Sequence, residues 1–183
     1  MPIEIERKFL VTTDAWRALA DDVVPMAQGY INDQAAMGDG LDGGGAQRAS
    51  VRVRIAGDDA FLNLKSFEAG RSRQEFDYAI PVVDARALLK LCVGGIIDKR
   101  RHYVRHGGHL WEIDEFLGDN AGLLVAEVEL GCADEAIDLP AWIGAEVTDA
   151  LRYYNLALAA RPYSQWSDAE RAATDLTGDT PCS

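Results

Sequence analysis

Apolar and polar residues alternate with a period of two along most of this chain. In residues 3–11, for example, Ile3, Ile5 and Phe9 alternate with charged side chains. Successive side chains of a strand point to opposite faces of a sheet, so each such run predicts a β-strand with one apolar and one polar face. Glycine-containing breaks between the runs are typical of hairpins. The predicted strands are residues 3–11, 50–55, 60–66, 73–80, 98–105, 109–116 and 123–130.

Three segments show helical spacing of apolar residues instead, at residues 14–24, 84–92 and 148–161. The predicted strands outnumber these helices and are joined by short breaks, which indicates an α+β fold built on an antiparallel sheet. We expect one domain over residues 1–163, with a flexible Gly- and Asp-rich loop at 33–47. The acidic residues 164–183 have little apolar content and are predicted to be a disordered tail.

The overall charge limits the classes of partner. The 183 residues include 18 basic and 30 acidic ones, for a net charge of −12, which argues against binding to nucleic acid or to an acidic membrane surface. The chain has no apolar run typical of a signal peptide or a membrane span, and its three cysteines form no metal-binding or disulfide pattern. We therefore expect a cytoplasmic protein without nucleic-acid or membrane partners.

The polar faces of the predicted strands carry charges of one sign. Arg52 and Arg54 alternate with apolar residues in one strand, and Glu127 and Glu129 do so in another. A strand face in contact with water would also place charges at every second position, but such faces ordinarily mix both signs. Neighbouring like charges are unfavourable unless a ligand lies between them. Carboxylates bind hard divalent cations, and Arg and Lys bind phosphates, so charges facing inward would suit a metal-bound polyphosphate.

Residues 4–8, Glu-Ile-Glu-Arg-Lys, resemble the ExExK signature of the CYTH superfamily, the triphosphate tunnel metalloenzymes. Later motifs follow in the family's order, including Gln-Gly-Tyr at 28–30, Val-Arg-Val-Arg at 51–54, Lys-Arg-Arg at 99–101 and Glu-Val-Glu at 127–129. The resemblance covers residues 3–160. It implies a closed eight-stranded antiparallel β-barrel, with about three packing helices, around a triphosphate.

The same resemblance implies roles for individual residues. Mg²⁺ or Mn²⁺ would be held by six carboxylates: Glu4, Glu6, Glu112, Asp114, Glu127 and Glu129. Phosphates would be held by eight basic residues: Lys8, Arg52, Arg54, Lys65, Arg73, Lys99, Arg101 and Arg152. Lys8 and Tyr30 would handle the attacking water, with the alternative that Lys8 is only a phosphate ligand. The nearby His102, His106 and His109 are expected to have surface or packing roles.

The function that this resemblance implies is a metal-dependent inorganic triphosphatase, which hydrolyses tripolyphosphate to pyrophosphate and phosphate. Other members of the family suggest two alternatives, an adenylyl cyclase-like activity and a thiamine or nucleoside triphosphatase activity in the same tunnel. A noncatalytic polyphosphate-binding module is a further alternative, although a simple anion-binding protein would not need six carboxylates. We expect a monomer or a homodimer.

Overall fold

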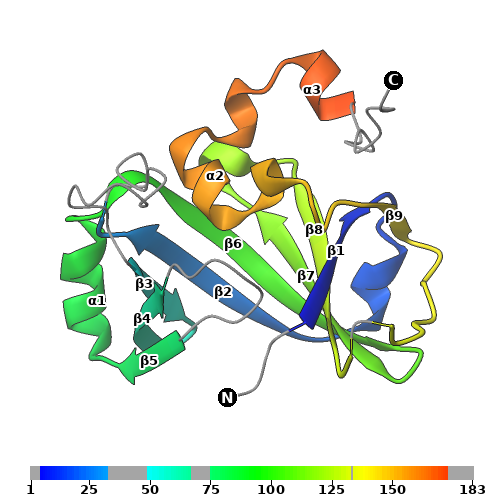
Figure 1. Cartoon of the computed structure of the whole chain (residues 1–183), viewed down its shortest axis with the longest axis horizontal. Helices are drawn as coiled ribbons and strands as arrows, with labels where there is room; N and C mark the ends of the chain where they lie inside the picture. Colours follow the sequence, from blue (N-terminus) through cyan, green and yellow to red (C-terminus); the bar gives the residue numbers. More distant parts are fainter. Residues whose placement is uncertain (1–4, 33–48, 67–74, 133, 173–183) are drawn as a thin grey trace, which may run out of the picture.

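The computed structural model describes residues 5–32, 49–66, 75–132 and 134–172, which form one antiparallel sheet and several short helices (Figure 1). The described sheet has nine strands in the order β5-β4-β3-β2-β6-β7-β8-β1-β9. The strands are β1 Ile5–Val11, β2 Ala20–Tyr30, β3 Ala49–Ala56, β4 Asp59–Ser66, β5 Glu75–Ala79, β6 Val93–His106, β7 His109–Phe116, β8 Leu124–Leu130 and β9 Ile143–Glu146. The helices are α1 Val82–Leu89, α2 Asn155–Ala160 and α3 Asp168–Ala172, with 3-10 turns η1 Ala15–Leu19, η2 Gly118–Asn120, η3 Leu151–Tyr153 and η4 Tyr163–Gln165.

The α+β class and the antiparallel sheet are confirmed, and every predicted strand is present. Within the described ranges, the sheet is not the closed eight-stranded barrel that was expected. It has nine strands, and no ladder joins its two edge strands, β5 and β9. The sheet still curves strongly, since residues from β1, β3 and β6 line one cavity. None of the helices in those ranges is long and apolar enough to cross a membrane.

The predicted helix over residues 14–24 is wrong. The chain makes the short turn η1, which buries Trp16, and then enters β2, where Val23 is 45% exposed. Here the helical spacing of apolar residues is coincidental. Pro25 disfavours a helix because it lacks the amide hydrogen, and the 14-residue strand β6 offers a continuous ladder to β2. The predicted helix at 84–92 is confirmed as α1.

The described residues form three hydrophobic clusters, and the apolar strand faces form two of them, both on the convex side of the sheet. One lies under α1 and includes Val53 and Ile55 of β3. The other includes Trp111 and Ile113 of β7 and Val128 of β8, and it is covered by Trp16 and Trp142. The alternation in the sequence therefore predicts the buried convex face correctly.

The third cluster closes one end of the concave face. Ile97, Phe116 and Val125 have the strand parity of the charged residues, yet they are buried under η3, α2 and the residues that follow (Figure 1). Helix α2 packs on β6. The predicted third helix therefore lies on the concave side of the sheet, and it is interrupted at Tyr154, whose backbone is extended.

Residues 164–172, the first part of the predicted disordered tail, are ordered and contact the core. Trp166 is only 5% exposed, and its ring contacts the rings of Tyr153 and Tyr163 at centroid distances of 5.3 and 5.1 Å. Arg161 forms an ion pair with Glu170 of α3. A single large aromatic residue is enough to attach this polar segment to the core. Residues 173–183 and the whole of the predicted loop at 33–47 lie outside the described residues.

Candidate active site

A cavity of about 760 Å³ lies against the charged, concave face of the sheet. Its walls come from strands on both sides of β6 and from residues 154–156. The predicted site residues that line it are Glu6, Lys8, Tyr30, Arg52, Arg54, Arg101, Glu112, Glu127 and Glu129. The one-sign charges of separate strands thus meet in a single cavity, as an inward-facing site requires.

Strand register places opposite charges beside each other around this cavity. Lys8 of β1 is directly opposite Glu127 of β8, and Arg101 of β6 is opposite Asp114 of β7. Directly opposite side chains in an antiparallel pair are close enough to interact. These two pairs are of unlike charge, whereas Glu6 lies opposite Glu129 and Glu112 lies opposite Glu127, so carboxylates also meet across the sheet.

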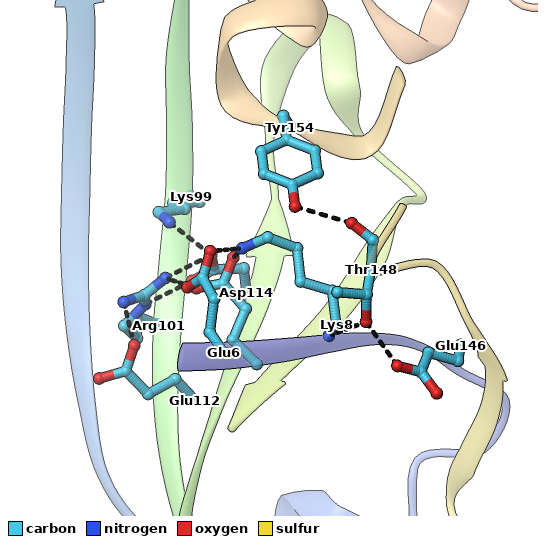
Figure 2. Close-up of polar contacts among 10 residues, drawn as sticks. Glu6, Lys8, Lys99, Arg101, Glu112, Asp114, Glu146, Thr148 and Tyr154 are labelled. Atoms are coloured by element: carbon cyan, nitrogen blue, oxygen red, sulfur yellow. Dashed lines mark hydrogen bonds and ion pairs between the residues drawn. The ribbon is translucent and has the colours of Figure 1, made fainter. Parts of the chain in front are cut away.

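Asp114 is the centre of a buried ion network (Figure 2). Its carboxylate accepts hydrogen bonds from Lys99 and from two nitrogens of Arg101, the latter both at 2.7 Å. Arg101 also contacts Glu112 and, at 2.9 Å, Glu127. Lys99 and Asp114 are about 1% exposed and do not line the cavity, so they support Arg101 from beneath instead of facing a ligand.

The network shifts the pKa of each member. Burial raises the pKa of Asp114, but Lys99 and Arg101 outweigh it and hold the pKa well below its ordinary value. Burial lowers the pKa of Lys99 to about 8, because the carboxylate that it faces is shared with the like charge of Arg101. Burial also raises the pKa of Glu112. Charge is therefore strongly held at Asp114 and more easily removed at Lys99.

Lys8 of β1 is almost completely buried beside this network, where it is 4% exposed. Its ammonium group lies 2.5 Å from Glu127 and 2.9 Å from Glu6. Burial alone would lower the pKa of Lys8, but these two carboxylates together raise it. In the free protein, Lys8 is therefore a cation at neutral pH.

The arginines of β3 are held differently. Arg52 donates to the amide oxygen of Asn63 at 3.0 Å, and Arg54 donates to that of Gln28 at 3.2 Å. The amide of Asn63 in turn donates to Asp77 of β5. No carboxylate of the described residues forms an ion pair with either guanidinium, and burial with the neighbouring charges of Arg52 and Arg101 lowers the pKa of Arg54 to about 10. An oriented, poorly neutralised cation of this kind is suited to binding an anion.

Besides Lys99 and Asp114, four predicted residues are not placed in the cavity. Arg152 does not line it, and its guanidinium stacks on Tyr153 and Trp166 at 4.9 and 4.8 Å. Glu4, Arg73 and the side chain of Lys65 lie outside the described residues. The histidines have local partners: His102 contacts Glu115, His106 contacts Asp138, and His109, at the edge of the cavity, contacts Glu135.

The residue-by-residue prediction missed Asn63 and Asp77 as supports of Arg52, and it gave Gln28 and Tyr154 no role. Strand parity contains the signal for Asn63, since it stands two positions before Lys65 and shares its face. For Tyr154, the signal is absent, because its position depends on the break between η3 and α2.

The carboxylates on the cavity wall have the donor chemistry that Mg²⁺ and Mn²⁺ prefer. The described residues contain no ready cluster of three or more metal-binding side chains, since Glu6, Glu112 and Glu127 are engaged by Lys8 and Arg101. The donor set therefore fits a hard divalent cation if such a cation replaces some of these ion pairs.

Comparison with known proteins agrees with this architecture. The CYTH domain model matches residues 2–163. The chain belongs to the CYTH domain family. An inorganic triphosphatase of Acetivibrio thermocellus is 40% identical over 166 residues, which cover 90% of this chain and 98% of the relative. One from Nitrosomonas europaea is 37% identical over 159 residues, which cover 85% and 96%.

Solved structures agree as well. A crystal structure of an inorganic triphosphatase superimposes with a TM-score of 0.64 at 33% identity, covering 87% of this chain and 95% of that one. A putative adenylyl cyclase from Hippeastrum, whose described activity is dominated by triphosphatase, has a TM-score of 0.51 at 15% identity over 70% of this chain and 80% of its own. The latter shares the fold alone. The docked segment at residues 164–172 lies beyond the family match.

Proposed function

We propose that this CYTH protein is an inorganic triphosphatase that hydrolyses tripolyphosphate to pyrophosphate and phosphate with a divalent cation, Mg²⁺ or Mn²⁺. The observation that carries the proposal is the pair Arg52 and Arg54, held by amides and facing a wall of carboxylates across one cavity. A polyphosphate needs cations for its oxygens and a metal-binding wall beside them, and this cavity offers both. The names of the similar proteins from Acetivibrio and Nitrosomonas support the same reaction.

In this proposal, Arg52, Arg54, Arg101 and Lys8 bind the phosphate oxygens and hold the chain of phosphates in line. Water adds to the terminal phosphorus, the bond to the pyrophosphate oxygen breaks, and one proton is released. Charge stabilisation of this kind supplies most of the catalysis in phosphoryl transfer. A divalent cation would neutralise the phosphate charge and make the bound water more acidic. The cavity carboxylates Glu6, Glu112, Glu127 and Glu129, with Glu4, would hold it.

The charge states favour a binding role for Lys8 over a role as general base. Its two carboxylate neighbours raise its pKa, so the free protein presents an ammonium group. Burial raises the pKa of Tyr30 as well, which keeps its hydroxyl protonated and able to donate to a phosphate or to the attacking water. We propose that Tyr30 orients the water and that Lys8 stabilises phosphate charge.

A phosphate-release screen tests the proposal. Tripolyphosphate, ATP, thiamine triphosphate and long-chain polyphosphate are each supplied with Mg²⁺, Mn²⁺ or EDTA. We expect the fastest release from tripolyphosphate, and none in EDTA. Cyclic AMP as the main product from ATP, or equal rates with EDTA, would contradict the proposal.

Variants of one arginine locate the activity in this cavity. Arg54→Met is expected to lower kcat/KM for tripolyphosphate about 10- to 1,000-fold, or about 1.4 to 4 kcal/mol of transition-state binding. Arg100→Met is the matched control, because Arg100 lies on β6 beside Arg101 but its side chain is 54% exposed on the other face. Equal losses in both variants would argue against this cavity.

A further inference from the structure

The aromatic ring of Tyr154 forms part of the binding site of the Lys8 ammonium group. The ammonium lies 4.9 Å from the centre of the ring, and the carboxylates of Glu127 and Glu6 lie 2.5 and 2.9 Å from it. Figure 2 shows the Tyr154 ring beside Lys8 and Thr148. A cation over an aromatic face is attracted by the ring electrons, most strongly where water is excluded. Lys8 is 4% exposed, so this contact lies in a poorly hydrated place.

Thr148 fixes the ring and the lysine to each other. The hydroxyl of Tyr154 donates to the carbonyl oxygen of Thr148 at 2.7 Å, and the backbone amide of Lys8 donates to the hydroxyl oxygen of Thr148 at 3.1 Å. The amide of Val147 also donates to the carbonyl of Lys8 at 2.8 Å. Tyr154 itself stands at the break between η3 and α2. The position of the ring is therefore set by backbone contacts to the same strand that carries Lys8.

The ring differs from the carboxylates in what competes for it. Glu127 is shared with Arg101, and Glu6 and Glu127 are among the carboxylates that the proposed function assigns to a divalent cation. A cation on these oxygens weakens their attraction for the ammonium, because their negative charge is then largely neutralised. A divalent metal does not compete for the face of Tyr154 in this way. The ring can therefore hold Lys8 in place while the carboxylates bind the metal.

We propose that Tyr154 is a positioning residue, which acts through Lys8 by holding its ammonium group against the cavity so that it meets a phosphate oxygen of the substrate. This inference rests on the proposed triphosphatase function. It assigns a role to the second tyrosine of the cavity, besides Tyr30. A purely structural Tyr154 would pack against its neighbours and affect ligands equally with or without Lys8.

A double-mutant cycle separates these roles. Tyr154→Leu and Lys8→Met are made singly and together, and the Kd for imidotriphosphate, a non-hydrolysable analogue of tripolyphosphate, is measured by calorimetry with Mg²⁺, because the ring should matter most when metal occupies the carboxylates. With Lys8 present, Tyr154→Leu is expected to weaken binding about 10-fold, which corresponds to about 1.4 kcal/mol. In the Lys8→Met background the same change should cost less than about 2-fold, because the ring has lost its cation. Equal losses in the two backgrounds would overturn the proposal.

Conservative variants and a second readout complete the test. Tyr154→Phe keeps the ring and should bind within about 3-fold of the wild type; if it is as weak as Tyr154→Leu, the hydroxyl and not the ring is responsible, and the proposal fails. Melting temperatures identify variants that do not fold, and Tyr154→Met then replaces Tyr154→Leu as the ring-free variant. In steady-state kinetics with Mg²⁺, Tyr154→Leu and Tyr154→Met are each expected to raise the KM for tripolyphosphate by a larger factor than they lower kcat.

The contact can also be measured without substrate. A ring face near the ammonium should shift the NMR signals of the terminal methylene protons of Lys8 upfield, and this shift should be lost in Tyr154→Leu but retained in Tyr154→Phe. An unshifted Lys8 in the wild type would overturn the inference. Failure of the wild type to bind or hydrolyse tripolyphosphate would instead overturn the proposed function, so the two failures are distinguishable.

Discussion

The two halves of the cavity hold their cations in different ways. In the ion-paired half, formed by β6, β7, β8 and β1, Lys99 and Arg101 share Asp114, and Lys8 is paired with Glu127. In the amide-held half, formed by β2, β3 and β4, neutral amides orient Arg52 and Arg54. An amide fixes the direction of a guanidinium without cancelling its charge, whereas a carboxylate does both.

This difference suggests a division of labour. The amide-held half keeps a surplus of positive charge that only an incoming anion neutralises. The ion-paired half has five carboxylates for three protein cations, so its carboxylates can exchange a protein cation for a metal. The two halves should therefore respond in opposite directions when a charge is removed.

The largest expected effect is on stability, and it tests this contrast directly. Asp114→Ala leaves Lys99 and Arg101 buried without their shared carboxylate, so we expect the free energy of unfolding to fall by about 3–5 kcal/mol. Arg54→Met is the matched variant in the other half. It should leave stability unchanged or raise it, because burial already opposes the charge of Arg54. Urea unfolding of both variants measures the difference, and a similar loss in each would remove the distinction between the halves.

A slightly smaller loss is expected where the C-terminal segment covers the ion-paired half. Trp166 is 5% exposed and packs on Tyr153, which precedes the ring over Lys8. Trp166→Ala should lower the free energy of unfolding by about 3 kcal/mol, as large-to-small changes of buried aromatic residues do. Trp166→Phe should recover more than half of it. A melting temperature unchanged in Trp166→Ala would mean that the segment does not dock.

The pH dependence of stability should come mainly from the ion-paired half. The pKa of Asp114 lies below its ordinary value of 3.8, so its charged form contributes stability that is complete above pH 3.8 and is lost as the pH falls below it. Asp114→Asn lacks this contribution at every pH, because its amide does not titrate. The difference in stability between wild type and Asp114→Asn should narrow by up to about 1.4 kcal/mol for each pH unit below 3.8. Thermal unfolding between pH 6 and pH 3 measures it, and a constant difference would refute the assignment.

The smallest expected effect concerns the amides. Asn63→Ala removes the acceptor that orients Arg52, and we expect KM for tripolyphosphate to rise about 3- to 10-fold with little change in kcat, close to the value of one hydrogen bond. Asn63→Thr, which keeps an acceptor oxygen, should recover part of the loss. An unchanged KM in Asn63→Ala would show that Arg52 is oriented by other contacts.

The residues that line the cavity were predictable from the sequence, whereas the depth of burial and the supporting amides were not. Nine of the predicted residues line the cavity, since parity along a strand decides which side chains share a face, and that is a local property. The depth of Lys99 and Asp114 was not predictable, because both have the same parity as Arg101 and Glu112 and differ only in what packs above them. The supporting amides were missed for a related reason. Strand parity puts Asn63 on the charged face, but a neutral amide has no charge that marks it as a part of the site.

By itself, the sequence determined the strand faces, the antiparallel α+β class and the family, because alternation and short motifs are encoded within a few residues of each other. Only the tertiary structure decided that residues 20–30 form a strand along β6, that Lys8 faces Glu127, and that Trp166 belongs to the core. Each of these depends on partners far along the chain, such as the 119 positions between Lys8 and Glu127. Local helix and strand propensities differ by only about 0.5 kcal/mol per residue. Ladder hydrogen bonds and buried aromatic area outweigh this difference at these positions.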